Sequence, residues 1–220
     1  MLVLIPIMIL FSYFIGAIPF GLVIVRLTTG KDIRKVESGR TGGTNAMRAA
    51  GWGAGILTAI FDTVKATVCV WLARWMFPEY YWLHVLAPVV AIIGHNYSIY
   101  LLERGVDGKI RFRGGAGGAP CVGGSIGLWF PSVFIVVPLS GLILYFVGYA
   151  SLATMGTALL STLIFGYQAW IGTSPWEYAV YGIIAEVVLI WALRPNIKRL
   201  LNGNERLVGW RARKNKSASL

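Results

Sequence analysis

Residues 2–27 read LVLIPIMILFSYFIGAIPFGLVIVRL, a run in which Arg26 is the only charged side chain. As a helix rising about 1.5 Å per residue, such a run is long enough to cross a hydrocarbon layer of about 30 Å. Similar apolar runs occupy Ile56–Phe77, Trp82–Leu102, Pro131–Tyr149, Leu152–Trp170 and Tyr178–Leu193. With 56% hydrophobic residues and a mean hydropathy of +0.67, the chain is predicted to be an all-α polytopic membrane protein.

Basic residues gather in three segments that follow apolar runs. Apart from Lys65 and Arg74, all of the 20 Lys and Arg residues fall in residues 26–48, 104–113 and 194–216. By the positive-inside rule these segments are expected in the cytoplasm, with the N-terminus outside and the C-terminus cytoplasmic. The polar and glycine-rich motifs lie in the same segments. We therefore expect a multi-pass protein of the bacterial inner (plasma) membrane whose active face is cytoplasmic.

An outside N-terminus and a cytoplasmic C-terminus require an odd number of crossings. The missing crossing is predicted between Gly117 and Phe130, a short glycine-rich segment whose small residues would allow close packing against neighbouring helices. The prediction is thus seven transmembrane helices, one of them short, with five as the alternative if the short segment and a neighbour only dip into the membrane. Residues 1–220 are expected to form a single integral-membrane domain.

Composition argues against other classes of protein. The net charge of +11 is compatible with nucleic-acid binding, but basic residues next to membrane helices are explained more simply by topology and anionic lipids. The two cysteines form no CxxC pair and no Cys/His cluster, so we expect no metal and no cofactor. Membrane lipids are expected partners, nucleic acid is not, and the oligomeric state is open.

The first basic segment contains the motif SGRTGGTNAMR at Ser38–Arg48. Glycines let backbone N–H groups turn toward an anion, hydroxyl groups donate hydrogen bonds, and arginines form paired hydrogen bonds with phosphate oxygens. A helix predicted to start at Asn45 and to run to Ile60 would favour the same anion through its N-terminal dipole. The motif therefore indicates a phosphate site, and the alternative is a flexible basic turn.

Two further polar motifs lie on the same predicted side of the membrane. His95 ends the third apolar run and is either a base or phosphate ligand or a histidine hydrogen-bonded at a helix end. The glycine-rich stretch 113–119 follows it, and Ser151 lies in a polar turn between two runs. Asn196 in the basic tail is a weak signal alone, because the tail is also typical of a juxtamembrane stop.

Ionisable residues also occur within the apolar runs. Asp62 and Lys65 are three positions apart and so share one face of a helix. Since such residues are costly at membrane depth and point into the bundle, we expect a structural pair that positions the site, with a proton relay as the alternative. Glu186 is a similar case without an obvious partner.

Together these residues resemble the bacterial membrane glycerol-3-phosphate acyltransferases that use acyl phosphate as donor, the PlsY family. The resemblance covers nearly the whole chain and rests on the order and spacing of several short motifs. They are GAIPFG at Gly16–Gly21, the Ser38–Arg48 loop, Asp62 with Lys65, Gly94-His95, Ser151-Leu152, and NIKRLLNGNE at Asn196–Glu205. The resemblance implies a seven-helix fold with an outside N-terminus.

The resemblance also implies a reaction and a set of site residues. Acyl phosphate and glycerol 3-phosphate would be the substrates, lysophosphatidate and phosphate the products, and phospholipid synthesis the pathway. His95, Arg48 and Ser38 would be the catalytic residues, with His95 as an orienting group or proton acceptor, although a phosphate oxygen of the substrate could itself be the base. The implied phosphate-binding and polar-contact residues are Ser38, Thr44, Asn45, Arg48, Ser151 and Asn196.

One departure from the family pattern concerns the second motif. The family usually has Gly-Gly-Lys-Gly there, whereas this chain has Ala116 in place of the lysine and a longer preceding loop. Lys109, Arg111 or Arg113 in that loop would be the replacement. The alternatives are a divergent paralogue that binds lipid or phosphate without catalysis, or a small-solute transporter suggested by the charges in the spans. The donor (acyl phosphate against acyl-CoA or acyl carrier protein) and the acyl-chain preference stay open.

Overall fold

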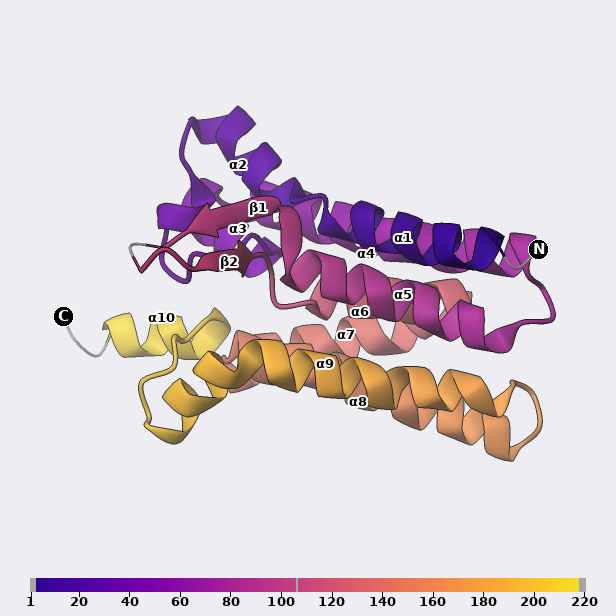
Figure 1. The fold of residues 1–220 in the computed structure, drawn as a ribbon. Coiled ribbons are helices and arrows are strands. Elements are labelled where there is room, and N and C mark those ends of the chain that lie inside the picture. The colour runs from indigo at the N-terminus through magenta and orange to yellow at the C-terminus, as the bar shows by residue number, and fades with distance from the viewer. Residues whose placement is uncertain (1–2, 106, 218–220) are drawn as a thin grey trace.

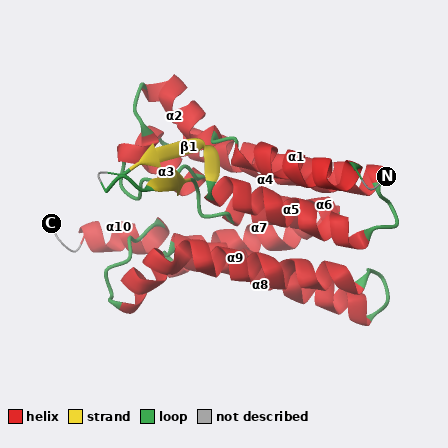
Figure 2. Ribbon diagram, viewed as in Figure 1, coloured by secondary structure: helices red, strands yellow, loops and turns green. Residues whose placement is uncertain are grey.

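The computed structural model describes residues 3–105 and 107–217, so residue 2 of the predicted first span lies outside the described part. Long helices run side by side and alternate in direction, with polar elements at one end (Figures 1 and 2). The bundle consists of α1 Leu4–Ala17, α4 Trp52–Met76, α5 Tyr81–Asn96, α6 Gly118–Leu128, α7 Val133–Leu142, α8 Ala150–Trp170 and α9 Trp176–Leu201. The polar end carries α2 Phe20–Thr29, α3 Gly43–Ala50, β1 Ser98–Arg104, β2 Ile110–Arg113 and α10 Gly209–Ser217.

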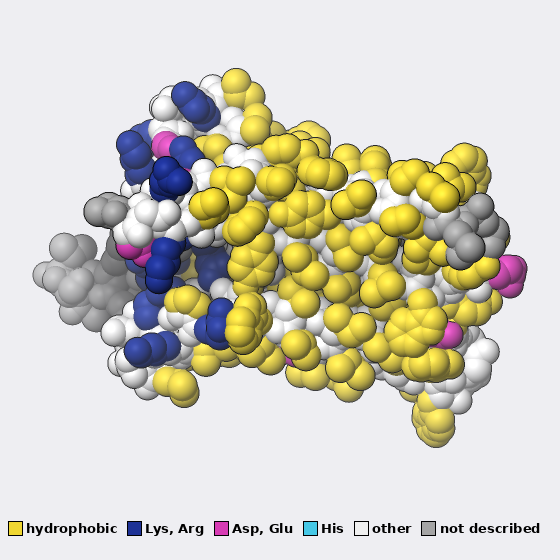
Figure 3. All heavy atoms as spheres, in the orientation of Figure 1, with side chains coloured by type: hydrophobic (Ala, Val, Ile, Leu, Met, Phe, Trp, Pro, Cys, Tyr) yellow, Lys and Arg dark blue, Asp and Glu magenta, His cyan; other side chains and the backbone are white. Residues whose placement is uncertain are grey.

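The bundle has the length and surface of a multi-pass membrane protein. Within the described residues, the helical segments long and apolar enough to cross a membrane are Leu4–Thr29, Trp52–Met76, Phe130–Val147, Ala150–Trp170 and Trp176–Leu201. Helices α5 and α6, of 16 and 11 residues, are shorter members of the same bundle. On the face drawn in Figure 3, apolar side chains cover the middle, and Lys and Arg gather at the end that bears the hairpin.

The first apolar run is broken into two helices, whereas the sequence predicted a single span. Helix α1 ends at Ala17, and α2 begins at Phe20 and leaves the bundle at an angle (Figure 1). The break falls at Ile18–Pro19, because proline has no N–H for the helical hydrogen bond and disfavours helical geometry in the residue before it. At the break, the Ile18 carbonyl accepts hydrogen bonds from the Phe20 N–H at 3.1 Å and from the buried Lys65 ammonium at 2.9 Å.

A two-stranded antiparallel sheet, β1–β2, was not predicted and shortens the predicted Trp82–Leu102 span, whereas the membrane bundle itself is all-α as predicted. Helix α5 stops at Asn96, and the chain continues as β1 with Leu101 buried and its neighbours facing outward. The side chain of Ser98 donates a hydrogen bond of 2.6 Å to the Ala17 carbonyl, which fixes the hairpin to the end of α1. An apolar run alone does not distinguish the end of a helix from a strand.

Helix α9, which contains the last apolar run, is longer than predicted, and helix α3 of the first loop is shorter. Helix α9 continues through Pro195 to Leu201, and the Trp191 carbonyl that faces the missing proline N–H accepts a hydrogen bond from Arg194 Nε at 2.8 Å. Helix α3 ends at Ala50 rather than continuing to residue 60, because Gly51 has φ of 88° and starts a second helix, α4.

Small residues on α6 allow the close packing that the sequence predicted. A Cβ on Gly123 would overlap the Thr63 carbonyl of α4, and a Cβ on Gly127 would press on Val70 of the same helix. The side chain of Thr67 adds a 2.8 Å hydrogen bond to the Gly123 carbonyl. Helix α6 therefore lies directly against α4 and delivers its N-terminus to the polar end of the bundle.

The first polar loop is tied down by ion pairs. Arg34 contacts the Asp32 carboxylate at 2.7 Å and Glu103 of β1 at 3.0 Å. The side-chain hydrogen bond from Arg34 lowers the pKa of Asp32 to about 2, so this carboxylate is charged at neutral pH. Arg113 of β2 also contacts Glu103, at 2.6 Å. The loop and the hairpin thus form one frame at the polar end.

Candidate active site

A cavity of about 280 Å³ lies at the polar end of the bundle, where the first loop, the glycine loop before α6, the start of α8 and the end of α9 meet. It is large enough for a small phosphate-bearing molecule. Of the residues that the sequence pointed to, the following line it: Ser38, Thr44, Asn45, Arg48, His95, Ser151 and Asn196. These positions are far apart in the chain, and the fold brings all of them to one site.

Helices α3, α6 and α8 begin at this cavity. The lining includes first-turn residues Gly43 and Thr44 of α3, Gly118 and Ala119 of α6, and Ala150 and Ser151 of α8. The first turn of a helix has backbone N–H groups without helical partners and carries a partial positive charge. A helix N-terminus is therefore a common place for phosphate to bind. Three N-termini at one cavity give it a strong preference for anions.

Ser151 is a second indication that the cavity is suited to bind an anion. Its side chain is 1% exposed and lines the cavity, yet its Oγ has no hydrogen-bond partner among the described residues. A buried hydroxyl without a partner costs free energy, which a bound ligand can recover. Sequence alone gave little weight to this residue, because a serine in a short turn is common.

The two asparagines of the site already make several contacts within the protein. The Asn45 amide nitrogen lies within hydrogen-bond distance of the carbonyls of Ile33, Val36 and Arg40, at 3.2, 3.0 and 2.8 Å, whereas its Oδ1 has no partner among the described residues. Asn196 donates to Glu205 at 2.9 Å and accepts from Arg40 at 3.1 Å. Both side chains therefore hold the walls of the cavity in place.

Arg40, Arg48 and Arg206 line the cavity, and of these Arg206 pairs with Glu37. Arg48, on α3, is half-buried and donates a long hydrogen bond of 3.4 Å to the Leu207 carbonyl. Arg40 is also half-buried and reaches across to the glycine loop and α9. Burial lowers the pKa of both guanidinium groups, which is the cost of keeping a cation out of water. An anion in the cavity would offset this cost.

His95 belongs to a buried group with Asp62 and Lys65. The Lys65 ammonium lies 2.7 Å from Asp62 Oδ1, 2.9 Å from the Ile18 carbonyl and 3.0 Å from His95 Nδ1. His95 Nδ1 also lies 3.5 Å from Asp62 Oδ1. An ammonium can only donate, so the tautomer that fits the Lys65 contact accepts at Nδ1 and carries its proton on Nε2. Asp62 and His95 line the cavity, and Lys65 lies behind them. The sequence predicted the Asp62–Lys65 pair but not its contact with His95.

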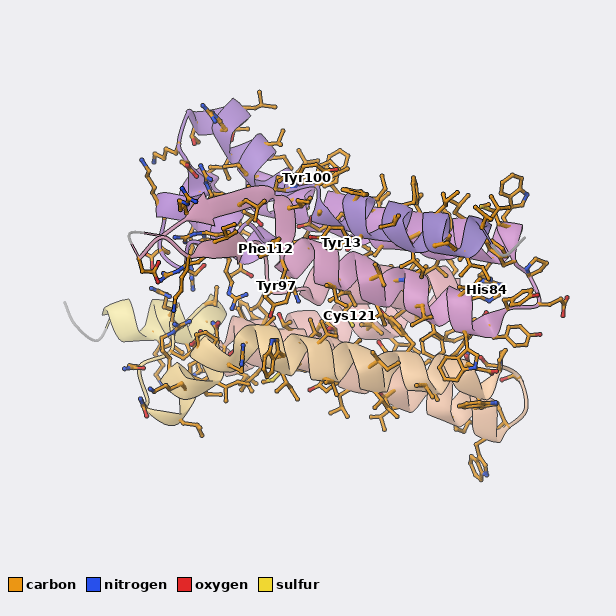
Figure 4. The ribbon with its side chains drawn as sticks, in the orientation of Figure 1. Tyr13, His84, Tyr97, Tyr100, Phe112 and Cys121 are labelled. Carbon is orange, nitrogen blue, oxygen red and sulfur yellow. The ribbon has the colours of Figure 1, made fainter. Side chains whose placement is uncertain are left out.

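The basic residues of the hairpin do not line this cavity. Arg111 pairs with Asp107 at 3.0 Å on the exposed side of the hairpin, and Lys109 lies between these two residues in sequence. Arg113 pairs with Glu103 and lines an adjacent cavity, whose rim includes Tyr97 and Phe112 (labelled in Figure 4). The side chains proposed to replace the missing lysine thus point elsewhere.

The second histidine of the chain has a structural role. His84 lies near the end of the bundle opposite the hairpin, as Figure 4 shows. Its two ring nitrogens are 2.9 Å from the Tyr178 hydroxyl and 2.9 Å from the Phe77 carbonyl. With both nitrogens engaged and the ring buried, His84 joins α5 to α9 and has no place in the site.

Comparisons with known proteins identify the family of this chain. The family model described as glycerol-3-phosphate acyltransferase matches residues 6–203. The chain belongs to the glycerol-3-phosphate acyltransferase family. The enzyme of that name from a Thermus thermophilus strain is 35% identical over 203 residues, which cover 92% of this chain and 94% of the relative. The enzyme of that name from Rubrobacter xylanophilus is 33% identical over 205 residues, which cover 93% of this chain and 96% of the relative.

A solved structure of the family has the same fold. It is the crystal structure of PlsY (YgiH), an integral membrane glycerol 3-phosphate acyltransferase, in the glycerol 3-phosphate form. The two structures superpose with a TM-score of 0.76 at 28% sequence identity, and the match covers 93% of this chain and 96% of the PlsY chain. The lysophosphatidic acid form of PlsY gives a TM-score of 0.74 at 26% identity. The predicted PlsY-family resemblance and the integral, multi-pass membrane fold are thereby confirmed.

Gly115 offers a test of how closely the acyltransferase site is packed. A Cβ at Gly115 would collide with the His95 ring at Nε2. The substitution Gly115→Ala must therefore move either the ring or the glycine loop, and we expect kcat/KM for acyl transfer to fall by about 10²-fold, since catalysis is sensitive to displacements of about 1 Å. Gly166→Ala on α8, where a Cβ meets nothing within 4 Å, is the matched control. Equal effects of the two substitutions would contradict this packing.

Proposed function

We propose that this glycerol-3-phosphate acyltransferase takes its acyl group from an acyl phosphate and transfers it in the cavity described above. The observation that carries the proposal is that the N-termini of α3, α6 and α8 meet Arg40 and Arg48 at one cavity, which suits phosphate-bearing substrates. The glycerol hydroxyl oxygen bonds to the acyl carbonyl carbon, and the bond from that carbon to the phosphate oxygen breaks. Lysophosphatidate and inorganic phosphate are the products. Because phosphate is a good leaving group, positioning and charge neutralisation suffice without a covalent acyl-enzyme.

In this proposal, Ser38, Thr44, Arg48 and Ser151 bind phosphate oxygens. The unpartnered Oγ of Ser151 and the loosely held guanidinium of Arg48 support these roles. Asn45 and Asn196 shape the phosphate site, because most of their amide groups contact protein atoms. Ser38, Arg48 and His95 line the cavity, and we assign them to the catalytic group.

We further propose that His95 orients the substrate as a hydrogen-bond donor through Nε2. The Lys65 contact at Nδ1 supports this, since a ring with its proton on Nε2 has no free lone pair toward the substrate. The proton of the glycerol hydroxyl then goes to an oxygen of the departing phosphate. His95 therefore contributes orientation, and the substrate supplies the base.

The site is proposed to face the cytoplasm of the bacterial inner membrane. In this topology the chain crosses seven times with α1, α4, α5, α6, α7, α8 and α9, the N-terminus is outside and the C-terminus is cytoplasmic. The alternating direction of these helices and the Lys and Arg side chains at the end that bears the hairpin support the orientation (Figures 1 and 3). Glycerol 3-phosphate and the released phosphate would then exchange with the cytoplasm, while the acyl chain of the donor and of the product stays in the membrane.

The test is a comparison of acyl donors with the purified protein and labelled glycerol 3-phosphate. Palmitoyl phosphate, palmitoyl-CoA and palmitoyl acyl carrier protein are offered separately, and lysophosphatidate and phosphate are measured. We expect lysophosphatidate from palmitoyl phosphate only, with one phosphate released per product. Product formation from palmitoyl-CoA but not from palmitoyl phosphate would contradict the proposal that acyl phosphate is the acyl donor. Binding of glycerol 3-phosphate with no turnover from any donor would favour the divergent, non-catalytic paralogue.

A further inference from the structure

Arg40 is the cation most closely tied to the glycine loop. Its Nη1 donates to the Gly115 carbonyl at 2.7 Å, and its Nη2 lies 2.7 Å from the Ala192 carbonyl and 3.1 Å from Asn196 Oδ1. It lines the main cavity and the adjacent one, so its guanidinium forms part of the wall between them. The first loop, the glycine loop and α9 thus meet at this one side chain.

The guanidinium of Arg40 keeps unused hydrogen-bonding capacity. An arginine has five N–H donors, and three of those on Arg40 have protein acceptors. None of its acceptors is a carboxylate, and no ion pair involves Arg40 in the part of the chain that the structure describes. Arg40 is therefore a half-buried cation held by neutral groups, without a counter-charge among the described residues.

The other charged residues of the lining are mostly neutralised within the protein. Arg206 pairs with Glu37 at 3.3 Å, and Glu205 pairs with Arg199 at 3.1 Å. Arg48 remains, but a phosphate monoester carries about −1.5 to −2 charges at neutral pH. Two phosphate-bearing substrates together bring about twice that charge. Arg48 carries one positive charge, less than either substrate brings, so a second cation at the cavity would improve the charge balance.

The glycine loop itself does not supply this cation. Its residue Ala116 lines the cavity with a methyl group, next to the Gly115 carbonyl that holds Arg40. The Thr41 N–H donates to the Gly114 carbonyl at 3.2 Å, so the backbone that carries Arg40 follows the glycine loop closely. A longer cationic side chain at position 116 would enter the same part of the cavity.

We propose that Arg40 binds a substrate phosphate group and supplies the positive charge that the glycine loop lacks at Ala116. Its two remaining N–H donors bind phosphate oxygens, while the contacts to Gly115, Ala192 and Asn196 hold the guanidinium plane in place. The inference rests on the acyl-transfer function proposed above, and it assigns this role to Arg40 rather than to Lys109, Arg111 or Arg113.

The test combines removal of the charge with its restoration from the other loop. We expect Arg40→Gln to lower kcat/KM by about 10²-fold or more, as for loss of one electrostatic contact in a transition state. Adding Ala116→Lys to this variant is expected to recover at least about tenfold of the loss, because the new ammonium reaches the same phosphate. Arg26→Gln, an exposed arginine on α2 that lines neither cavity, is the control and should leave activity unchanged.

Two results would overturn the proposal. One is an Arg40→Gln enzyme whose kcat/KM stays near that of the parent protein. The other is a folded Arg40→Gln enzyme that lost activity and is not improved by Ala116→Lys, which would indicate a structural role. Misfolding cannot imitate the expected rescue, because the second substitution restores charge and none of the lost hydrogen bonds.

Direct binding separates this inference from the acyl-transfer function. Titration calorimetry with glycerol 3-phosphate is run on the parent protein, Arg40→Gln and Arg26→Gln, with no acyl donor present. A loss of about tenfold or more in affinity for Arg40→Gln alone supports the phosphate contact even if no donor gives turnover. Equal affinity in all three proteins, together with unchanged turnover of the Arg40 variant, counts against it.

Discussion

Arg48→Ala is expected to lower kcat/KM for acyl transfer by about 10²–10³-fold. The reason is that Arg48 brings the positive charge of α3 to the cavity. Within the described part of the protein, the substitution removes one long side-chain hydrogen bond, of 3.4 Å to the Leu207 carbonyl. Its removal therefore takes charge from the transition state and little from the fold. The measurement is initial rates of lysophosphatidate formation against glycerol 3-phosphate concentration.

The matched control for Arg48 is Arg26→Ala, which removes the same kind of side chain from the exposed face of α2. Both variants should melt within a few degrees of the parent protein. Activity of the Arg48 variant that equals that of the Arg26 variant would mean that Arg48 does not bind phosphate, and the assignment of the whole Ser38–Arg48 loop would fail with it.

Lys65→Met is expected to destabilise the protein by about 3–5 kcal/mol, the largest effect on folding that we predict. The side chains of Lys65 and Asp62 are 2% and 1% exposed, so the substitution leaves the Asp62 carboxylate buried without its counter-charge. Thermal unfolding in detergent micelles measures the effect as a lower melting temperature. We also expect Lys65→Met to lose acyl-transfer activity, because His95 Nδ1 loses the hydrogen-bond donor that keeps the ring proton on Nε2.

The double variant Asp62→Asn, Lys65→Met provides the control for this prediction. Because both charges are then absent, we expect it to regain much of the stability lost in Lys65→Met while its activity stays low. A double variant as unstable as the single one would show that packing around Lys65 matters more than its charge. Full activity in the double variant would contradict the role given to Lys65 in positioning His95.

Hydropathy and charge were sufficient to predict the bundle and its basic end. Most helices lie within a few residues of the predicted apolar runs, because burial in lipid or protein requires the same residues. The bend at Pro19, the hairpin at Ser98–Arg113 and the extension of α9 beyond Leu193 were missed. Proline itself marks the bend locally, whereas the hairpin and the extension of α9 depend on tertiary partners, namely Ala17 at Ser98 and Arg40 at Asn196.

The sequence predicted which residues form the site better than it predicted how they are arranged. Motif order pointed to Ser38, Arg48, His95 and Asn196, and all of them line one cavity. The convergence of α3, α6 and α8 N-termini was not visible in sequence, because it depends on how the helices pack. The hairpin cations looked like replacements for the lysine only because they are near Ala116 in the chain, whereas Arg40 is near it in space.

A structure of the protein with glycerol 3-phosphate bound tests the central claim most directly, namely that this cavity is the phosphate site of an acyltransferase. We predict the phosphate oxygens within about 2.7–3.2 Å of Arg48, Arg40 and Ser151, at the N-termini of α6 and α8. A substrate bound instead at the adjacent cavity beside Arg113 and Arg199, with the main cavity empty, would contradict the account.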